Sequence, residues 1–248
     1  MLRDQILYIV DSDQVFSSAI MITTRRSALK SLASTATLLT AGTSVTENML
    51  ANSVGTSPIL KAPKKIAYIV FNGITWLDFV GIYDPLSRLK SMSFLPSLDW
   101  DICAFTDSVT DNFGLEVKPP KVQNSLADYD VIIVPGGFGT RPLQHDVEFM
   151  QWIKTSDKVP LKVSICTGSL LLGAAGFLQG KTATTNFNEY ETLRPYCQTV
   201  ATDRIVEDDG IITAGAVSAS LDLGLYLCER WAGSEATTEI RKRMNYLG

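Results

Sequence analysis

The chain has 248 residues, of which 46% are hydrophobic and 19% charged, values typical of one soluble domain with an appendage. A net charge of −4, with no basic stretch among aromatic residues, argues against a nucleic-acid partner. No apolar run approaches the length that spans a bilayer. The four cysteines include no C-x-x-C pair, which argues against a disulfide framework and against zinc. The single histidine, His145, is the only candidate for a histidine base.

The first sixty residues differ in composition from the rest. The pair Arg25-Arg26 precedes a stretch of small and moderately apolar residues that contains no acidic side chain. This pattern is typical of a twin-arginine signal, so we predict a signal and linker over 21–60 and export to the periplasm by the twin-arginine machinery. Translation would then begin at Met21, and 1–20 would be untranslated or disordered. The alternative is an amphipathic N-terminal helix on a cytoplasmic protein.

From residue 64 to residue 248, expected strands and helices alternate along the chain. Continuous apolar runs predict parallel strands that are buried on both faces. The expected strands are 66–71, 100–105, 131–134, 161–165, 183–185 and 198–201, followed by a hairpin over 204–213. The expected helices are 76–90, 142–154, 170–178, 218–231 and 235–246. The alternation predicts an α/β domain with a doubly wound, mainly parallel sheet and helices on both faces.

Cys166 is the residue that points most directly to chemistry. It follows the expected strand 161–165 and precedes small residues and an expected helix, so its side chain should project from the carboxyl edge of the sheet. The start of that helix would direct N–H groups and a positive dipole end at the sulfur, which favours the thiolate. A buried structural cysteine is the alternative.

Two further groups lie at strand ends that should meet Cys166 at the same edge of the sheet. Asp78 follows the first strand, and Gly136-Gly137 follows the strand 131–134. A carboxyl group, backbone amides and a thiol could therefore share one pocket, since glycine allows the backbone to approach a reacting atom closely. By contrast, His145 lies in a charged stretch and is expected at the surface. The remaining cysteines are expected to be core thiols: Cys103, Cys197 and Cys228.

These motifs resemble the ThiJ/PfpI superfamily of the class I glutamine amidotransferase-like, flavodoxin-like fold, and within it the isocyanide hydratase branch. The resemblance covers 66–246, and its motifs occur in order. They are Leu77-Asp78-Phe79-Val80-Gly81, Val134-Pro135-Gly136-Gly137-Phe138-Gly139, 166–176, Lys181-Thr182-Ala183-Thr184-Thr185 and 215–222.

The resemblance implies a small-molecule hydratase that converts an isocyanide to an N-substituted formamide without metal or organic cofactor. It implies Cys166 as the nucleophile and Asp78 as an acid and base beside the sulfur. Thr167 would supply a hydroxyl and an amide. Backbone amides for the substrate would come from Gly136, Gly137 and Gly81. Relatives of this kind are usually homodimers, so a homodimer is expected.

Some residues depart from the branch pattern, and other functions remain open. Asn186 stands where a histidine usually follows the threonine pair, Ile82 replaces a proline, and Asn245 replaces an acidic residue. The alternatives are a redox-sensing or stress-response ThiJ/PfpI-like protein, and a glyoxalase-like activity on small aldehydes. The second alternative is disfavoured because such chemistry generally uses a histidine.

Overall fold

The computed structural model describes residues 60–246. The expected signal over 21–60 and the segment 1–20 therefore lie outside the described residues, apart from Leu60. The domain boundary near residue 64 and the twin-arginine signal stay predictions.

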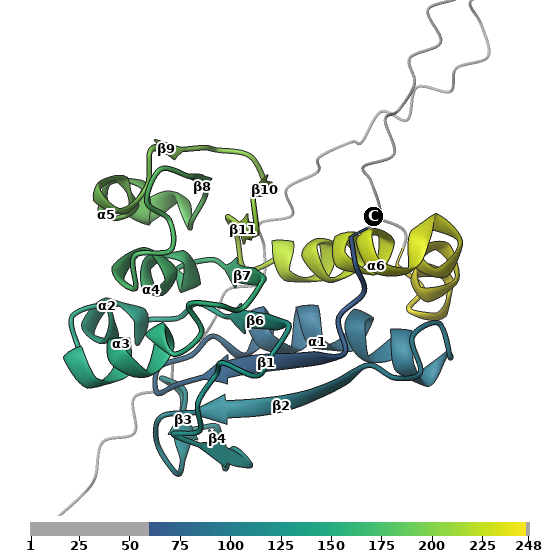
Figure 1. Ribbon diagram of the computed structural model, residues 1–248, viewed down its shortest axis with the longest axis horizontal. Coiled ribbons are helices and arrows are strands. Elements are labelled where there is room, and N and C mark those ends of the chain that lie inside the picture. Colours follow the sequence, from purple (N-terminus) through teal and green to yellow (C-terminus); the bar gives the residue numbers. More distant parts are fainter. Residues whose placement is uncertain (1–59, 247–248) are drawn as a thin grey trace, which may run out of the picture. The chain divides into compact units, whose positions relative to one another are not determined.

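A seven-stranded sheet forms the centre of the domain, in the order β10-β11-β7-β6-β1-β2-β5 (Figure 1). All neighbouring pairs are parallel except β10 and β11. The strands of this sheet are β1 (Lys65–Val70), β2 (Asp99–Ala104), β5 (Lys121–Val122), β6 (Val131–Val134), β7 (Leu161–Ile165), β10 (Ile205–Asp208) and β11 (Ile211–Ala214). Two smaller pairs lie outside it: β3 (Val109–Thr110) with β4 (Glu116–Val117), and β8 (Thr182–Ala183) with β9 (Thr199–Val200).

The helices form two groups beside the sheet, which confirms the predicted doubly wound α/β class. Helices α1 and α6 pack against each other, whereas α4 contacts α2, α5 and strands β6 and β7 (Figure 1). The helices are α1 (Trp76–Ser91), α2 (Thr140–Leu143), α3 (Val147–Lys154), α4 (Gly168–Ala174), α5 (Tyr190–Leu193) and α6 (Ala219–Arg243), with 3₁₀ turns η1 (Phe187–Glu189) and η2 (Arg194–Tyr196).

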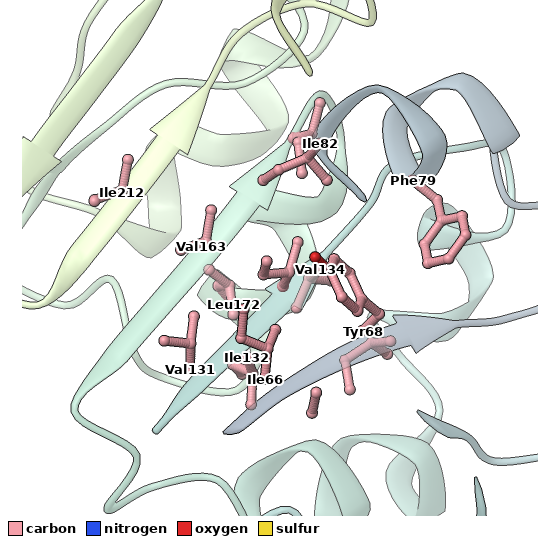
Figure 2. Close-up of a cluster of buried hydrophobic side chains, with 14 of the residues drawn as sticks. Ile66, Tyr68, Phe79, Ile82, Val131, Ile132, Val134, Val163, Leu172 and Ile212 are labelled. Atoms are coloured by element: carbon pink, nitrogen blue, oxygen red, sulfur yellow. The ribbon is translucent and has the colours of Figure 1, made fainter. Parts of the chain in front are cut away.

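The core explains why the apolar runs form the central strands. All four residues of β6 are buried, and so are Ile66 to Val70 of β1. Figure 2 shows side chains of β1, β6, β7, α1 and α4 meeting in this core, among them Ile132, Val163, Ile82 and Leu172. Strands covered on both faces need apolar residues at every position, which is the pattern of these segments.

The expected single helix over 142–154 is wrong, because two helices occupy this region. Helix α2 ends at Leu143, and α3 begins at Val147. The carboxylate of Asp146 accepts a hydrogen bond from the backbone N–H of Phe149 (3.0 Å), so this side chain caps the start of a new helix.

The C-terminal helices follow the prediction more closely. Gly233 interrupts α6 with φ +85° and ψ 173°, at the position between the two helices expected from the sequence. In the described part of the chain, no helix combines the length and the apolar character needed to cross a membrane.

Candidate functional site

Cys166 lies in the turn between β7 and α4, as predicted. Its φ of +54° is in the left-handed region, which is unusual for a residue with a Cβ and is typical of strained functional turns. The Cys166 N–H donates to the carbonyl of Ala214 (2.8 Å), and the Cys166 carbonyl accepts from the Thr185 hydroxyl (3.0 Å). These bonds to two other segments hold the turn, and only 6% of Cys166 is exposed.

Asp78 is the third residue of α1 and is fully buried. Its Oδ2 accepts a hydrogen bond from the backbone N–H of Gly136 (2.8 Å). Its Oδ1 is also buried and has no hydrogen-bond partner among residues 60–246. Burial raises the pKa of Asp78 from an ordinary 3.8 to about 7, against the lowering effect of the Gly136 N–H. This carboxyl group can therefore gain or lose a proton near neutral pH.

Gly136 is the residue on which the parts of the site converge. A Cβ at this position would lie 2.6 Å from the Thr167 nitrogen, 2.8 Å from Thr167 Oγ1 and 2.9 Å from Asp78 Oδ2. Its carbonyl accepts from the backbone N–H of Thr75 (2.9 Å), which joins the end of β6 to the start of α1. Only glycine leaves room for the two side chains to approach this turn so closely.

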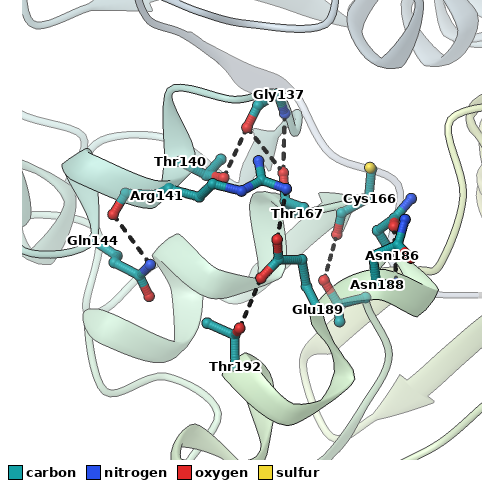
Figure 3. A network of polar contacts seen from close by, with 11 residues as sticks. Gly137, Thr140, Arg141, Gln144, Cys166, Thr167, Asn186, Asn188, Glu189 and Thr192 are labelled. Atoms are coloured by element: carbon teal, nitrogen blue, oxygen red, sulfur yellow. Dashed lines mark hydrogen bonds and ion pairs between the residues drawn. The ribbon is translucent and has the colours of Figure 1, made fainter.

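Gly136 and Gly137, whose role as substrate-facing amides stays a prediction, donate hydrogen bonds to side chains of the site. The Gly136 N–H donates to Asp78 Oδ2. The Gly137 N–H donates to Thr167 Oγ1 (3.0 Å) (Figure 3). The Thr167 hydroxyl in turn donates to the Gly137 carbonyl (3.1 Å). Both amides therefore hold the side chains of the site in position.

Gly81, whose role as a substrate-binding amide stays a prediction, lies at a close contact between two helices. It lies inside α1, where a Cβ would come within 2.1 Å of Ser220 Oγ on α6. The Ser220 hydroxyl contacts the carbonyls of Val217 (2.8 Å) and Leu77 (3.2 Å). The glycine allows α1 and α6 to pack closely.

The ionisation of Cys166 differs from the sequence-based expectation that its turn favours the thiolate. Burial first, and then the nearby charge of Asp78, raise the pKa of the Cys166 thiol from 9.0 to about 11. Hydrogen bonds to the sulfur from the Thr167 backbone, Asn186 and the Thr167 hydroxyl lower the pKa by less. Near neutral pH the group is a thiol, because a buried thiolate beside a carboxylate is unfavourable.

The structure adds residues to the site that the motifs did not identify. Figure 3 shows Asn186 beside Cys166, with Arg141 and Glu189 on neighbouring segments. Arg141 and Glu189 form an ion pair (2.6 Å) that joins the segment after Gly137 to the segment after Asn186. In the sequence, Asn186 stands out only as a departure from a family pattern, and no local signal predicts the ion pair, whose partners are 48 positions apart.

The other titratable candidates belong to other segments of the chain. His145 is exposed between α2 and α3, as expected. All four cysteines are free; Cys103 and Cys228 are buried as expected, while Cys197 is partly exposed. Among residues 60–246, no group of three or more His, Cys, Asp or Glu side chains is arranged to hold a metal ion.

Fold and site together define an α/β protein with a strained cysteine at a strand-to-helix turn and a buried aspartate beside it. The model of the DJ-1/PfpI family matches residues 64–230, about two thirds of the sequence. The chain belongs to this family.

Individual relatives agree with this assignment. An isonitrile hydratase from Pseudomonas putida is 33% identical over 184 residues, which cover 73% of this chain and 78% of the relative. The crystal structure of a ThiJ/PfpI family protein from Pseudomonas syringae matches with a TM-score of 0.68 and 26% identity, covering 82% of this chain and 83% of the other. The HTH-type transcriptional regulator CdhR from Pseudomonas aeruginosa is 25% identical over 71% of this chain, but only over 53% of its own length.

Proposed function

We propose that this protein hydrates isocyanides to N-substituted formamides without a metal or organic cofactor. In this proposal Cys166 is the nucleophile and Asp78 is the acid and base. Similarity to an isonitrile hydratase over 78% of that relative supports the reaction class. The observation that carries the proposal is the pairing of Cys166 with a fully buried carboxyl group whose pKa of about 7 suits proton transfer in both directions.

The first half of the reaction attaches the substrate to the sulfur. Cys166 transfers its proton to the Asp78 carboxylate as the sulfur forms a bond to the terminal isocyanide carbon. Asp78 then gives this proton to the same carbon, and the product is a thioimidate, R–N=CH–S, bound to Cys166. The thiol pKa of about 11 requires a base at this step, and Asp78 is the acidic side chain whose charge acts on the sulfur.

The second half releases the product. Asp78 takes a proton from water as the water oxygen adds to the thioimidate carbon, and it passes this proton to the nitrogen. The carbon–sulfur bond then breaks as the new hydroxyl loses its proton through Asp78, which returns it to the sulfur. The sum is isocyanide plus water giving formamide, and both Cys166 and Asp78 end in their starting states.

Exposed aromatic side chains adjacent to the site favour an apolar substituent on the substrate. Phe138 follows Gly137 and is 64% exposed, and Phe187 follows Asn186 and is 70% exposed. The Arg141 guanidinium lies 5.0 Å from the Phe138 ring centre and pairs with Glu189, so it links the segments that carry the two rings. Apolar and aromatic groups bind favourably to such surfaces.

The two alternative activities fit the site less well. A redox sensor needs a thiolate at rest, whereas burial and Asp78 raise the pKa of Cys166. A glyoxalase-like mechanism generally uses a histidine, and His145, the single histidine, is exposed between α2 and α3. Export to the periplasm by the twin-arginine machinery and assembly into a homodimer are proposed as well, on the sequence pattern and the resemblance alone.

The test is formamide production from an aryl isocyanide by purified protein. Cys166→Ala should abolish turnover, and Asp78→Asn should lower it by about 10²-fold or more. Cys197→Ala is the matched control, because it removes a partly exposed thiol outside the site. Equal rates in wild type, Cys166→Ala and Asp78→Asn would eliminate the mechanism. Absence of turnover together with reversible peroxide modification of Cys166 would favour sensing.

A further inference from the structure

Asn186 is held in one orientation by its own backbone turn. It occupies the N-cap position of η1, where its Oδ1 accepts a hydrogen bond from the backbone N–H of Asn188 (3.1 Å) (Figure 3). The backbone carbonyl of Asn186 accepts a hydrogen bond from the backbone N–H of Glu189 (2.8 Å). Because the side-chain oxygen is bound to the turn, the –NH₂ group is the end of Asn186 left free to face the Cys166 sulfur, beside which the residue lies (Figure 3). Its effect there is to lower the pKa of the thiol.

The segment before Asn186 is fixed to the same cysteine. The Thr185 hydroxyl donates to the Cys166 carbonyl (3.0 Å), and the Thr184 N–H donates to Thr213 Oγ1 (2.9 Å) on β11. Beyond the turn, the ion pair of Glu189 with Arg141 (2.6 Å) holds the other end of the segment. Contacts of the residues before and after Asn186 therefore hold its side-chain amide in place near Cys166.

The Thr167 hydroxyl is a weaker candidate for the same task. It has one proton, and the Gly137 carbonyl lies 3.1 Å from its oxygen and competes for that proton. The Asn186 –NH₂ has two protons and does not ionise, so it remains a donor at every pH at which the protein is folded. A hydrogen bond to an anionic acceptor is about twice as strong as one between neutral groups.

We propose that Asn186 is a positioning residue that directs the Cys166 sulfur and stabilises its anionic form, opposing burial and the charge of Asp78. An effect of Asn186 on turnover rests on the proposed function, whereas its effect on the ionisation of Cys166 does not. Its direct consequence is a thiol that ionises more easily than the surroundings alone would allow.

The test measures alkylation of Cys166 by iodoacetamide between pH 7 and pH 9.5, followed peptide by peptide with mass spectrometry. In this range the rate constant is proportional to the thiolate fraction. Loss of one charge-assisted hydrogen bond should raise the pKa of the thiol by about one unit, so Asn186→Leu should be alkylated about tenfold more slowly at pH 8. Asn186→Asp should be slowed at least as much. It keeps the oxygen that caps η1 but replaces the donor with a negative charge.

Two controls separate this role from a structural one. Asn188→Ala removes an exposed side chain but keeps the backbone N–H, so it should react at the wild-type rate. Alkylation of Cys197 in the same digests reports loosening of the fold and should be unchanged.

Wild-type rates at Cys166 in both Asn186 variants would overturn the inference, whether or not the protein hydrates isocyanides. Slower alkylation in a protein that shows no hydration would uphold the role of Asn186 and reject the proposed function.

Discussion

Replacing Asp78 by asparagine should make the protein more stable above neutral pH. The folded-state pKa of Asp78 is raised by burial from 3.8 to about 7, so the folded protein holds this proton more tightly than the unfolded chain does. The stabilisation from the neutral carboxyl is fully present below pH 3.8 and is lost as the pH rises through 7. The rise in pKa corresponds to about 4 kcal/mol in the free energy of unfolding.

Asparagine has nearly the same shape, and its Oδ1 can still accept the N–H of Gly136. The variant therefore avoids the cost of a buried charge but keeps the hydrogen bond. Urea unfolding of wild type and Asp78→Asn should give similar stabilities near pH 4. The difference should grow by about 1.4 kcal/mol per pH unit up to pH 7 and then level off near 4 kcal/mol in favour of the variant.

The comparison of two curves cancels the other titrating groups, because the two proteins share them. A difference that stays constant between pH 4 and pH 8 would refute the reasoning, since Asp78 would then titrate alike in the folded and unfolded states. Urea unfolding of the Cys166→Ala protein checks whether the neighbouring thiol causes the effect. This variant removes the thiol and keeps Asp78 buried, so its stability should depend on pH as that of the wild type does.

Two glycine substitutions test the geometry. Gly136→Ala would place a methyl group 2.6 Å from the Thr167 nitrogen. It should lower the free energy of unfolding by about 1–3 kcal/mol, measured by urea unfolding. It should also lower turnover by more than about tenfold, measured by formamide production. Wild-type turnover in this variant would contradict the inference that the close approach of Asp78 and Thr167 to Gly136 is needed for activity. Gly81→Ala should lower stability by a similar 1–3 kcal/mol but leave Cys166 alkylation unchanged, because its new methyl meets Ser220 on α6. Adding Ser220→Gly should recover part of that loss in a double-mutant cycle, and strictly additive effects would argue against the contact.

Much of the fold was predictable because strongly apolar segments allow few structures. The strands 131–134 and 161–165 agree with β6 and β7 residue for residue, and α1 differs from its prediction only at its last residue. The helix over 142–154 was mispredicted because the capping side chain of Asp146 divides an otherwise helical pattern. The short strands β3, β4 and β5 were missed, since two-residue strands carry no periodic signal.

The sequence by itself determined that Cys166 lies between a buried strand and a helix, and that Asp78 and the Gly136-Gly137 turn lie at the same edge of the sheet. These conclusions depend on local patterns and on the rule that parallel strands end at one edge. Only the tertiary structure decided how the groups act on one another. Burial raises the pKa of Asp78 to about 7 and that of the Cys166 thiol to about 11. The glycine amides bind Asp78 and Thr167, and Asn186 lies beside Cys166. Such effects depend on desolvation and on contacts between segments distant in the chain, and local sequence specifies neither.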